Sequence, residues 1–323
     1  MSRLFTFLCL SLLFNLAQAQ LPTPEYKKGQ AILSGTIANY NPDDNLIFKI
    51  GAPNIVMGTA ETLYPTVEAD GSFTINIPLY HHTQVRMMIG NADLVILLSP
   101  EKETNVAINL SNPPGKQFVF SGQYATINNE WCQPELITKI PPVYSDGDLL
   151  DSIVGISANE FKKRCINQYK RYVTHNNAQL QFSEDTRTLA NLSCAFDCLE
   201  NLQATHYCLQ TAYQKKENIT REQAFAAFLD VYLPDDFHNY LKDFPVNHPL
   251  ALYCYNYRNV VMDLYDTHKD PLAYEKNLLK NAPLTKEEQT LIHQYETAFK
   301  AGISFQQESE LMALSAKYFK END

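Results

Sequence analysis

The sequence contains none of the common catalytic or phosphate-binding motifs. It has no GxSxG, no HExxH, no GxxxxGK followed by Ser or Thr, and no GxGxxG, and it has no CxxC pair. A serine hydrolase, a zinc peptidase, a nucleotide-binding enzyme and a thioredoxin-type enzyme therefore all lack the residues that would carry their chemistry. We assign no catalytic residue, and whether the chain is an enzyme stays open.

The chain also has too few basic residues to bind nucleic acid. Its 26 Lys and Arg are outnumbered by 36 Asp and Glu, which gives a net charge of −10. Binding along a phosphate backbone needs a basic face, so nucleic acid is not an expected partner. With 45% apolar residues in 323, the chain is long enough for two domains that each bury a core.

Long apolar runs are missing except at the N-terminus. Arg3 is followed by a largely apolar run from Leu4 to Phe14, and Ala17-Gln18-Ala19 has the small-x-small pattern of a signal peptidase site. An eleven-residue run is too short to cross a hydrocarbon core of ~30 Å. We therefore expect residues 1–19 to be a signal peptide cleaved after Ala19, and an exported, periplasmic protein without a stable membrane anchor after cleavage.

Six cysteines remain beyond the predicted cleavage site: Cys132, Cys165, Cys194, Cys198, Cys208 and Cys254. Cys194 and Cys198 lie on one face of a predicted helix, and Leu202, Thr205, Cys208, Leu209 and Ala212 continue that face at helical spacing. We interpret the cysteines as small core residues, with one or two structural disulfides as the alternative. No zinc-ligand spacing is present, and no metal or cofactor is expected.

Composition changes near residue 122. Eight of the eleven glycines lie from Gly29 to Gly122, whereas fifteen of the nineteen tyrosines follow Gly122. Residues 20–122 contain about eight short alternating runs, typical of an antiparallel β-sandwich or barrel, and Asp70-Gly71 predicts a tight hairpin. Residues 123–323 have helical periodicity, so we predict an α+β protein with a β-sandwich domain followed by an all-α domain.

Several helices have specific start signals. Thr220 with Gln223 and Thr285 with Glu288 have the capping-box spacing. Pro249 predicts the start of a helix over 250–268, and the residues from Asp185 to Gln214 predict one long amphipathic helix.

Two sets of side chains are candidates for binding. Tyr253, Tyr257 and Arg258 lie close in sequence and could line a groove for peptide or glycan, although aromatic residues at such spacing more often pack between helices. His81 and His82 are adjacent on a predicted strand, so they point to opposite faces and cannot chelate one ion together. We expect them at a surface or a sheet edge.

Several segments together resemble a known family. They are GQAILSGTIAN, VEADGSFTINIPL, LVILLSPEKETNVAINL, HPLALYCYNYRNVV and FVFSGQYATINNEW, the last with Gly122, Tyr124, Ala125 and Asn128. The arrangement resembles the N-terminal accessory region, a DUF4369-like β-domain plus helical domain, of TlpA-like periplasmic thiol–disulfide oxidoreductases.

The resemblance implies a role in client recognition or in positioning a thioredoxin-fold domain. The family's catalytic WCxxC has no counterpart here, because Trp131-Cys132 is followed by Gln133-Pro134-Glu135. The expected partners are therefore a thioredoxin-fold domain or protein and exported client proteins. The alternative is a stand-alone envelope protein that binds peptide or glycan through its tyrosine-rich helical domain.

Overall fold

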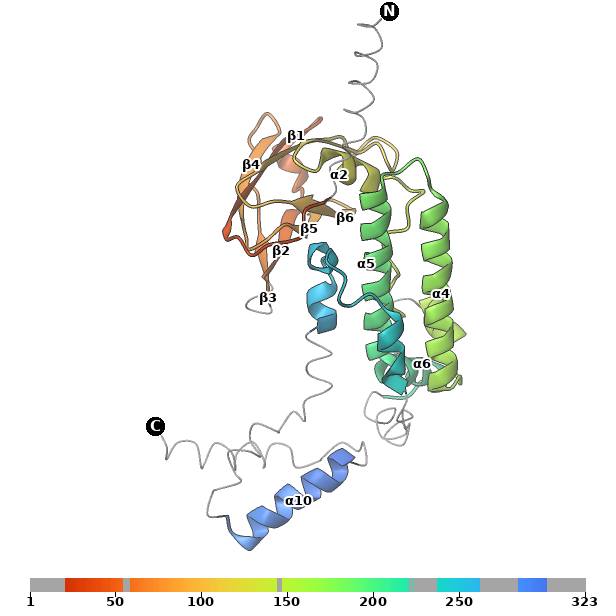
Figure 1. Ribbon diagram of the computed structural model, residues 1–323. Helices are drawn as coiled ribbons and strands as arrows, with labels where there is room; N and C mark the ends of the chain where they lie inside the picture. The colour runs from red at the N-terminus through yellow and green to blue at the C-terminus, as the bar shows by residue number, and fades with distance from the viewer. Residues whose placement is uncertain are drawn as a thin grey trace, which may run out of the picture. The chain divides into compact units, whose positions relative to one another are not determined.

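The computed structural model confirms the predicted α+β class. It describes residues 21–54, 59–143, 147–220, 223, 237–261 and 284–300. Strands occupy the N-terminal part of the chain and helices the C-terminal part (Figure 1). The predicted signal peptide and the helices expected beyond residue 300 lie outside the described residues.

Two four-stranded sheets form the β-sandwich. Four strands follow the order β4-β1-β7-β8 in the first sheet: β1 (Gly29–Ile37), β4 (Ser72–Leu79), β7 (Glu103–Ile108) and β8 (Phe118–Gly122). The second sheet has the order β3-β2-β5-β6 and contains β2 (Phe48–Asn54), β3 (Thr59–Leu63), β5 (Thr83–Ile89) and β6 (Ala92–Leu98).

Alternating side chains of both sheets enclose a single core. Leu33 and Val106 of the first sheet and Ile50 and Met87 of the second have no exposed surface, and all belong to one apolar cluster. Such burial of alternate residues is what the sequence pattern predicts for a sheet with one face on a core. One pairing differs from the expected antiparallel arrangement, because β1 and β7 run parallel.

The tight turn predicted at Asp70-Gly71 is present, but it joins only the single antiparallel bridge of Val67 with Phe73, because β3 and β4 belong to different sheets. Gly71 has a φ of 82°, a backbone conformation that residues with a Cβ rarely adopt. The Asp70 carboxylate accepts hydrogen bonds from the Ser72 amide at 2.9 Å and the Ser72 hydroxyl at 2.6 Å. These hydrogen bonds lower the pKa of Asp70.

The chain divides into two compact units, and their limits differ from the single domain boundary predicted at residue 122. Of the described residues, the first unit contains the chain up to Leu136 together with Asn176–Ala190 and Asn247–Tyr255. The second contains Ile137–His175, Asn191–Val246 and the chain from Asn256 on. Thus short helical segments far along the sequence pack in the same unit as the sandwich, which composition alone does not reveal.

The helices differ from the prediction at two places. The predicted long helix is divided at Ala204 into α5 (Glu184–Gln203) and α6 (Thr205–Glu217). The helix expected from residue 250 is interrupted: η4 (Ala251–Tyr253) is a 3-10 turn, and Cys254 is extended, with φ −76° and ψ 131°.

Both capping boxes are confirmed. Thr220 and Gln223 bond reciprocally, and so do Thr285 and Glu288 at the start of α10 (Lys286–Lys300).

In the second unit, polar side chains of α5 bind the backbone of the segment that precedes α3. Asp197 accepts a hydrogen bond from the Ile140 amide at 2.7 Å, and Asn201 accepts one from the Val143 amide at 2.9 Å. Asn256 Nδ2 also donates to the Asp197 carboxylate. Burial raises the pKa of Asp197 to about 7, against hydrogen bonds that lower it.

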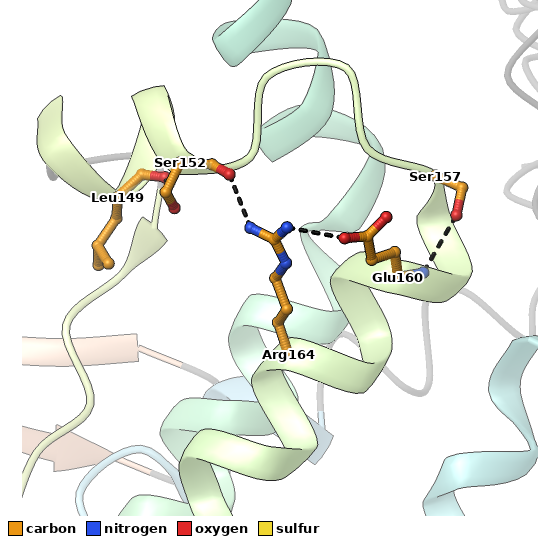
Figure 2. A network of polar contacts seen from close by, with 5 residues as sticks. All are labelled: Leu149, Ser152, Ser157, Glu160 and Arg164. Carbon is orange, nitrogen blue, oxygen red and sulfur yellow. Dashed lines mark hydrogen bonds and ion pairs between the residues drawn. The ribbon is translucent and has the colours of Figure 1, made fainter.

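The turn between α3 (Gly147–Ser152) and α4 (Ala158–Ala178) is tied by one arginine (Figure 2). Arg164 donates to the Ser152 carbonyl and to the Glu160 carboxylate, both at 2.7 Å, and Ser157 Oγ accepts from the Glu160 amide. Because positive charge is favourable at the C-terminus of a helix, the guanidinium stabilises the end of α3. This network explains the local structure of the turn.

Candidate functional site

The strongest candidate site surrounds the first described residues of the chain, within the first compact unit. Leu21 and Pro22 belong to no helix or strand, and Leu21 is only 8% exposed. The Leu21 amide donates a hydrogen bond of 3.0 Å to Oδ2 of Asp185, in the first turn of α5. A carboxylate far along the sequence thus binds a main-chain N–H of this segment.

Tyr253 binds the next main-chain group. Its hydroxyl donates a hydrogen bond of 2.8 Å to the Pro22 carbonyl, 231 residues away in sequence. Tyr253 has no exposed surface, so its ring packs inside the unit. This agrees with the alternative that tyrosines at such spacing pack between elements. The 3-10 turn of η4 places this side chain.

Two more rings lie against Tyr253. The ring of Tyr124 lies 6.5 Å from that of Tyr253 at 90°, and the ring of His82 lies 6.0 Å from it. Tyr124 Oη lies 2.6 Å from His82 Nδ1 and is also hydrogen bonded to the Tyr253 hydroxyl. We call His82, Tyr124 and Tyr253 the aromatic triplet.

The local backbone explains the position of Tyr124. Gly122 ends β8 with a φ of 88°, and Tyr124 itself has a φ of 59° as the N-cap of α2 (Ala125–Trp131). This sharp reversal joins the sandwich to the helix. A left-handed conformation is uncommon for a residue with a large side chain and is found mainly where the surrounding structure enforces it.

The two histidines are placed differently from the sequence expectation. They lie in a bend between β4 and β5, not on a strand. His81 is buried, at 6% exposed, and its Nδ1 lies 2.7 Å from the His82 carbonyl. Burial lowers the pKa of both imidazoles, which favours their neutral forms.

Glu130 of α2 fixes the start of α5. Its carboxylate accepts hydrogen bonds from the Ser183 amide at 3.1 Å, from Ser183 Oγ at 2.7 Å and from Thr186 Oγ1 at 2.5 Å. A carboxylate at this position also complements the helix dipole. The acceptor Asp185 is therefore held on a well-anchored helical turn.

A cavity of about 440 Å³ lies beside these contacts. Its walls come from three parts of the first unit: Leu21 and Pro22, the Gly122–Ile127 stretch, and Ser183–Asp185. The volume falls within the usual range for ligand-binding pockets. The cavity is thus continuous with the segment that Asp185 and Tyr253 hold.

The charges of the lining are all of one sign. Among the described residues, Glu184 and Asp185 are the carboxylates of the lining, and no Lys, Arg or His belongs to it. Burial raises the pKa of Asp185, although the bond from the Leu21 amide opposes this change. The walls therefore favour neutral or positively charged groups and disfavour anions.

The other predicted binding residues do not share this unit with Tyr253. Tyr257 and Arg258 belong to the second unit. The ring of Tyr257 packs on Phe196 at 5.1 Å, and the Arg258 guanidinium donates to Asn259 Oδ1 at 2.9 Å. The groove expected from Tyr253, Tyr257 and Arg258 stays a prediction.

The six cysteines are described as thiols, five of them buried and Cys132 partly buried. Cys165 of α4, Cys198 of α5 and Cys208 of α6 approach closely enough to affect one another's ionisation. Burial raises the pKa of Cys132 and of Cys165 to about 12. Thiolates at neutral pH are therefore disfavoured at both positions.

Within the part of the chain that the structure describes, no group of three His, Cys, Asp or Glu side chains is placed to hold a metal ion. Among the same residues, no helix combines the length and apolarity that a membrane crossing needs.

In comparisons with protein-family models, curated proteins and solved structures, the chain matched none.

Proposed function

We propose that this chain is an exported, periplasmic interaction module that binds extended peptide segments of client proteins and has no catalysis of its own. The observation that carries the proposal is the way in which Asp185 and Tyr253 hold the backbone of Leu21 and Pro22 beside a cavity of about 440 Å³. One side chain accepts from an amide and the other donates to a carbonyl. These are the groups that every peptide offers.

The sequence resemblance supports the same role. In TlpA-like oxidoreductases the corresponding region is an accessory part. The present chain has segments that resemble this region, and it has no CxxC pair. We propose client recognition, beside a thioredoxin-fold partner, as its contribution. A peptide is favoured over a glycan because Tyr253 already bonds a peptide carbonyl.

Binding of an unfolded protein tests the proposal. The probe is a reduced and carboxymethylated protein that cannot refold, labelled with a fluorophore and titrated with the full chain while anisotropy is recorded. We expect saturable binding that Thr126→Trp weakens at least fivefold, because Thr126 lines the cavity.

The matched control is Thr36→Trp. Thr36 is an exposed residue of β1 in the same unit and does not line the cavity. This variant should bind the probe like the wild type. No binding by the wild-type chain, or equal loss in both variants, would refute the proposed function.

A further inference from the structure

The segment that occupies the candidate site has an unusual local sequence. Leu21-Pro22-Thr23-Pro24 places proline at every second position. Proline fixes its own φ and disfavours helix in the residue before it, so such a segment is already extended when free. Its binding costs less conformational entropy than that of an ordinary segment.

The side chains around this segment have the chemistry of a proline-recognition groove. Grooves for proline-rich peptides are lined by aromatic rings whose polar groups bond to the peptide carbonyls. Here three rings of the aromatic triplet pack on one another, and Tyr124 of these lines the cavity. The Tyr253 hydroxyl bonds the carbonyl of Pro22, whose ring stays exposed. Asp185 adds an acceptor for the amide of the residue before the proline.

The site is larger than the part that Leu21 and Pro22 fill. Both residues line the cavity together with Tyr124 and the first turn of α5. Further residues of a peptide therefore have space next to the pair that is already held.

We propose that this groove selects extended, proline-containing segments of client proteins, and that the chain's own Leu21–Pro24 segment is a built-in competitor for it. The inference rests on the proposed function and names its ligand class. Signal cleavage after Ala19 would leave the competing segment tethered at one end only. A client peptide would then displace it without unfolding the unit.

The tether sets the size of the expected effect. A segment linked through a few residues competes at an effective concentration on the order of millimolar. The apparent affinity for an added peptide is reduced by the fraction of sites that remain open. Releasing the segment should therefore raise that affinity by about tenfold.

The experiment compares two labelled peptides on the full chain, expressed from Met1 so that processing takes place. One peptide is Leu-Pro-Thr-Pro-Glu-Tyr, which is the chain's own 21–26 sequence, and the other has both prolines replaced by alanine. The release variant is Pro22→Gly with Pro24→Gly, which loosens the competing segment. The matched control is Pro113→Gly with Pro114→Gly, an exposed pair in the turn between β7 and β8.

The proline peptide should bind the release variant about tenfold more tightly than it binds the wild type or the control variant. It should also bind the release variant at least fivefold more tightly than the alanine peptide does. Adding Tyr253→Phe to the release variant should weaken the proline peptide by roughly two- to tenfold, the usual effect of one hydrogen bond.

Two results would overturn the inference while leaving the proposed function intact, provided that the unfolded probe still binds. One is equal affinity for the two peptides, and the other is equal affinity of wild type and release variant for the proline peptide. If the peptides and the unfolded probe all fail to bind, the proposed function fails as well.

Discussion

Asn128 and Asn129, adjacent on α2, each bond the backbone of a different edge strand. Asn128 accepts from the Leu97 amide at 2.7 Å and donates to the Leu97 carbonyl at 3.1 Å, on β6. Asn129 does the same with Phe120 of β8, at 2.8 and 3.0 Å. One short helix therefore covers an edge of both sheets, where exposed backbone groups would invite pairing with other chains.

The two asparagines should contribute unequally to stability. Asn128 is 1% exposed, and Asn128→Leu would leave the Leu97 amide and carbonyl without their partner. We expect a loss of about 2–4 kcal/mol in the free energy of unfolding. Asn129 is more exposed, so Asn129→Leu should cost about 1 kcal/mol, since water can replace its bonds. Urea unfolding measures both, and equal losses would contradict this account of edge protection.

Glu130 should couple energetically to Ser183. Removing the carboxylate with Glu130→Gln weakens the anchoring of α5 and should lower the free energy of unfolding by about 1–3 kcal/mol. A double-mutant cycle with Ser183→Ala should give a coupling energy of at least about 0.5 kcal/mol, because the two side chains bond directly. Additive losses would show that the contact contributes nothing to stability.

Asp197 should make stability depend on pH. Its pKa is about 7 in the folded chain, above the ordinary value of 3.8 that we take for the unfolded chain. Between about pH 4 and pH 7 the folded state therefore binds a proton that the unfolded state has lost, and this contribution to stability decreases as the pH rises. Asp197→Asn removes that dependence.

The stability of Asp197→Asn relative to wild type should therefore increase between pH 4.5 and pH 8. The expected gain is about 3 kcal/mol as an upper limit. Urea unfolding at the two pH values measures it. If the free energies of unfolding of the two proteins differ by the same amount at both pH values, Asp197 is already ionised at the lower pH in the folded chain.

The buried thiols should resist alkylation in the native state. Because burial raises the pKa of Cys165 to about 12, iodoacetamide at pH 8 should modify it far more slowly in the native than in the unfolded chain. Modification of all six described cysteines in the unfolded, unreduced chain would support the core interpretation. Two or four blocked positions would support the disulfide alternative.

Local patterns in the sequence predicted much of the fold. Alternating apolar residues located the strands, capping-box spacing located the contacts of Thr220 with Gln223 and of Thr285 with Glu288, and the cysteine face is buried from Cys194 to Ala212. The parallel pairing of β1 with β7 was not predicted, because strand neighbours distant in sequence leave no local signal. The break at Cys254 was also missed, since it depends on tertiary contacts of Tyr253.

The candidate site was predicted only in part. Tyr253 was named, but as a partner of Tyr257 and Arg258, because sequence analysis groups residues that are close along the chain. Its actual partners, Pro22 and Tyr124, lie in distant segments. Asp185 gave no signal of its own, because an acid in the first turn of a helix is already explained by the helix dipole. The alternating prolines after Leu21 were the one usable clue.

Amide hydrogen exchange at Leu21, followed by NMR, tests the central claim most directly. In the chain alone, the bond to Asp185 should slow exchange of this amide relative to an unstructured peptide. Adding saturating Leu-Pro-Thr-Pro-Glu-Tyr should accelerate it, because the peptide replaces the chain's own segment. Unchanged or slower exchange at Leu21 while the peptide is bound would contradict the account.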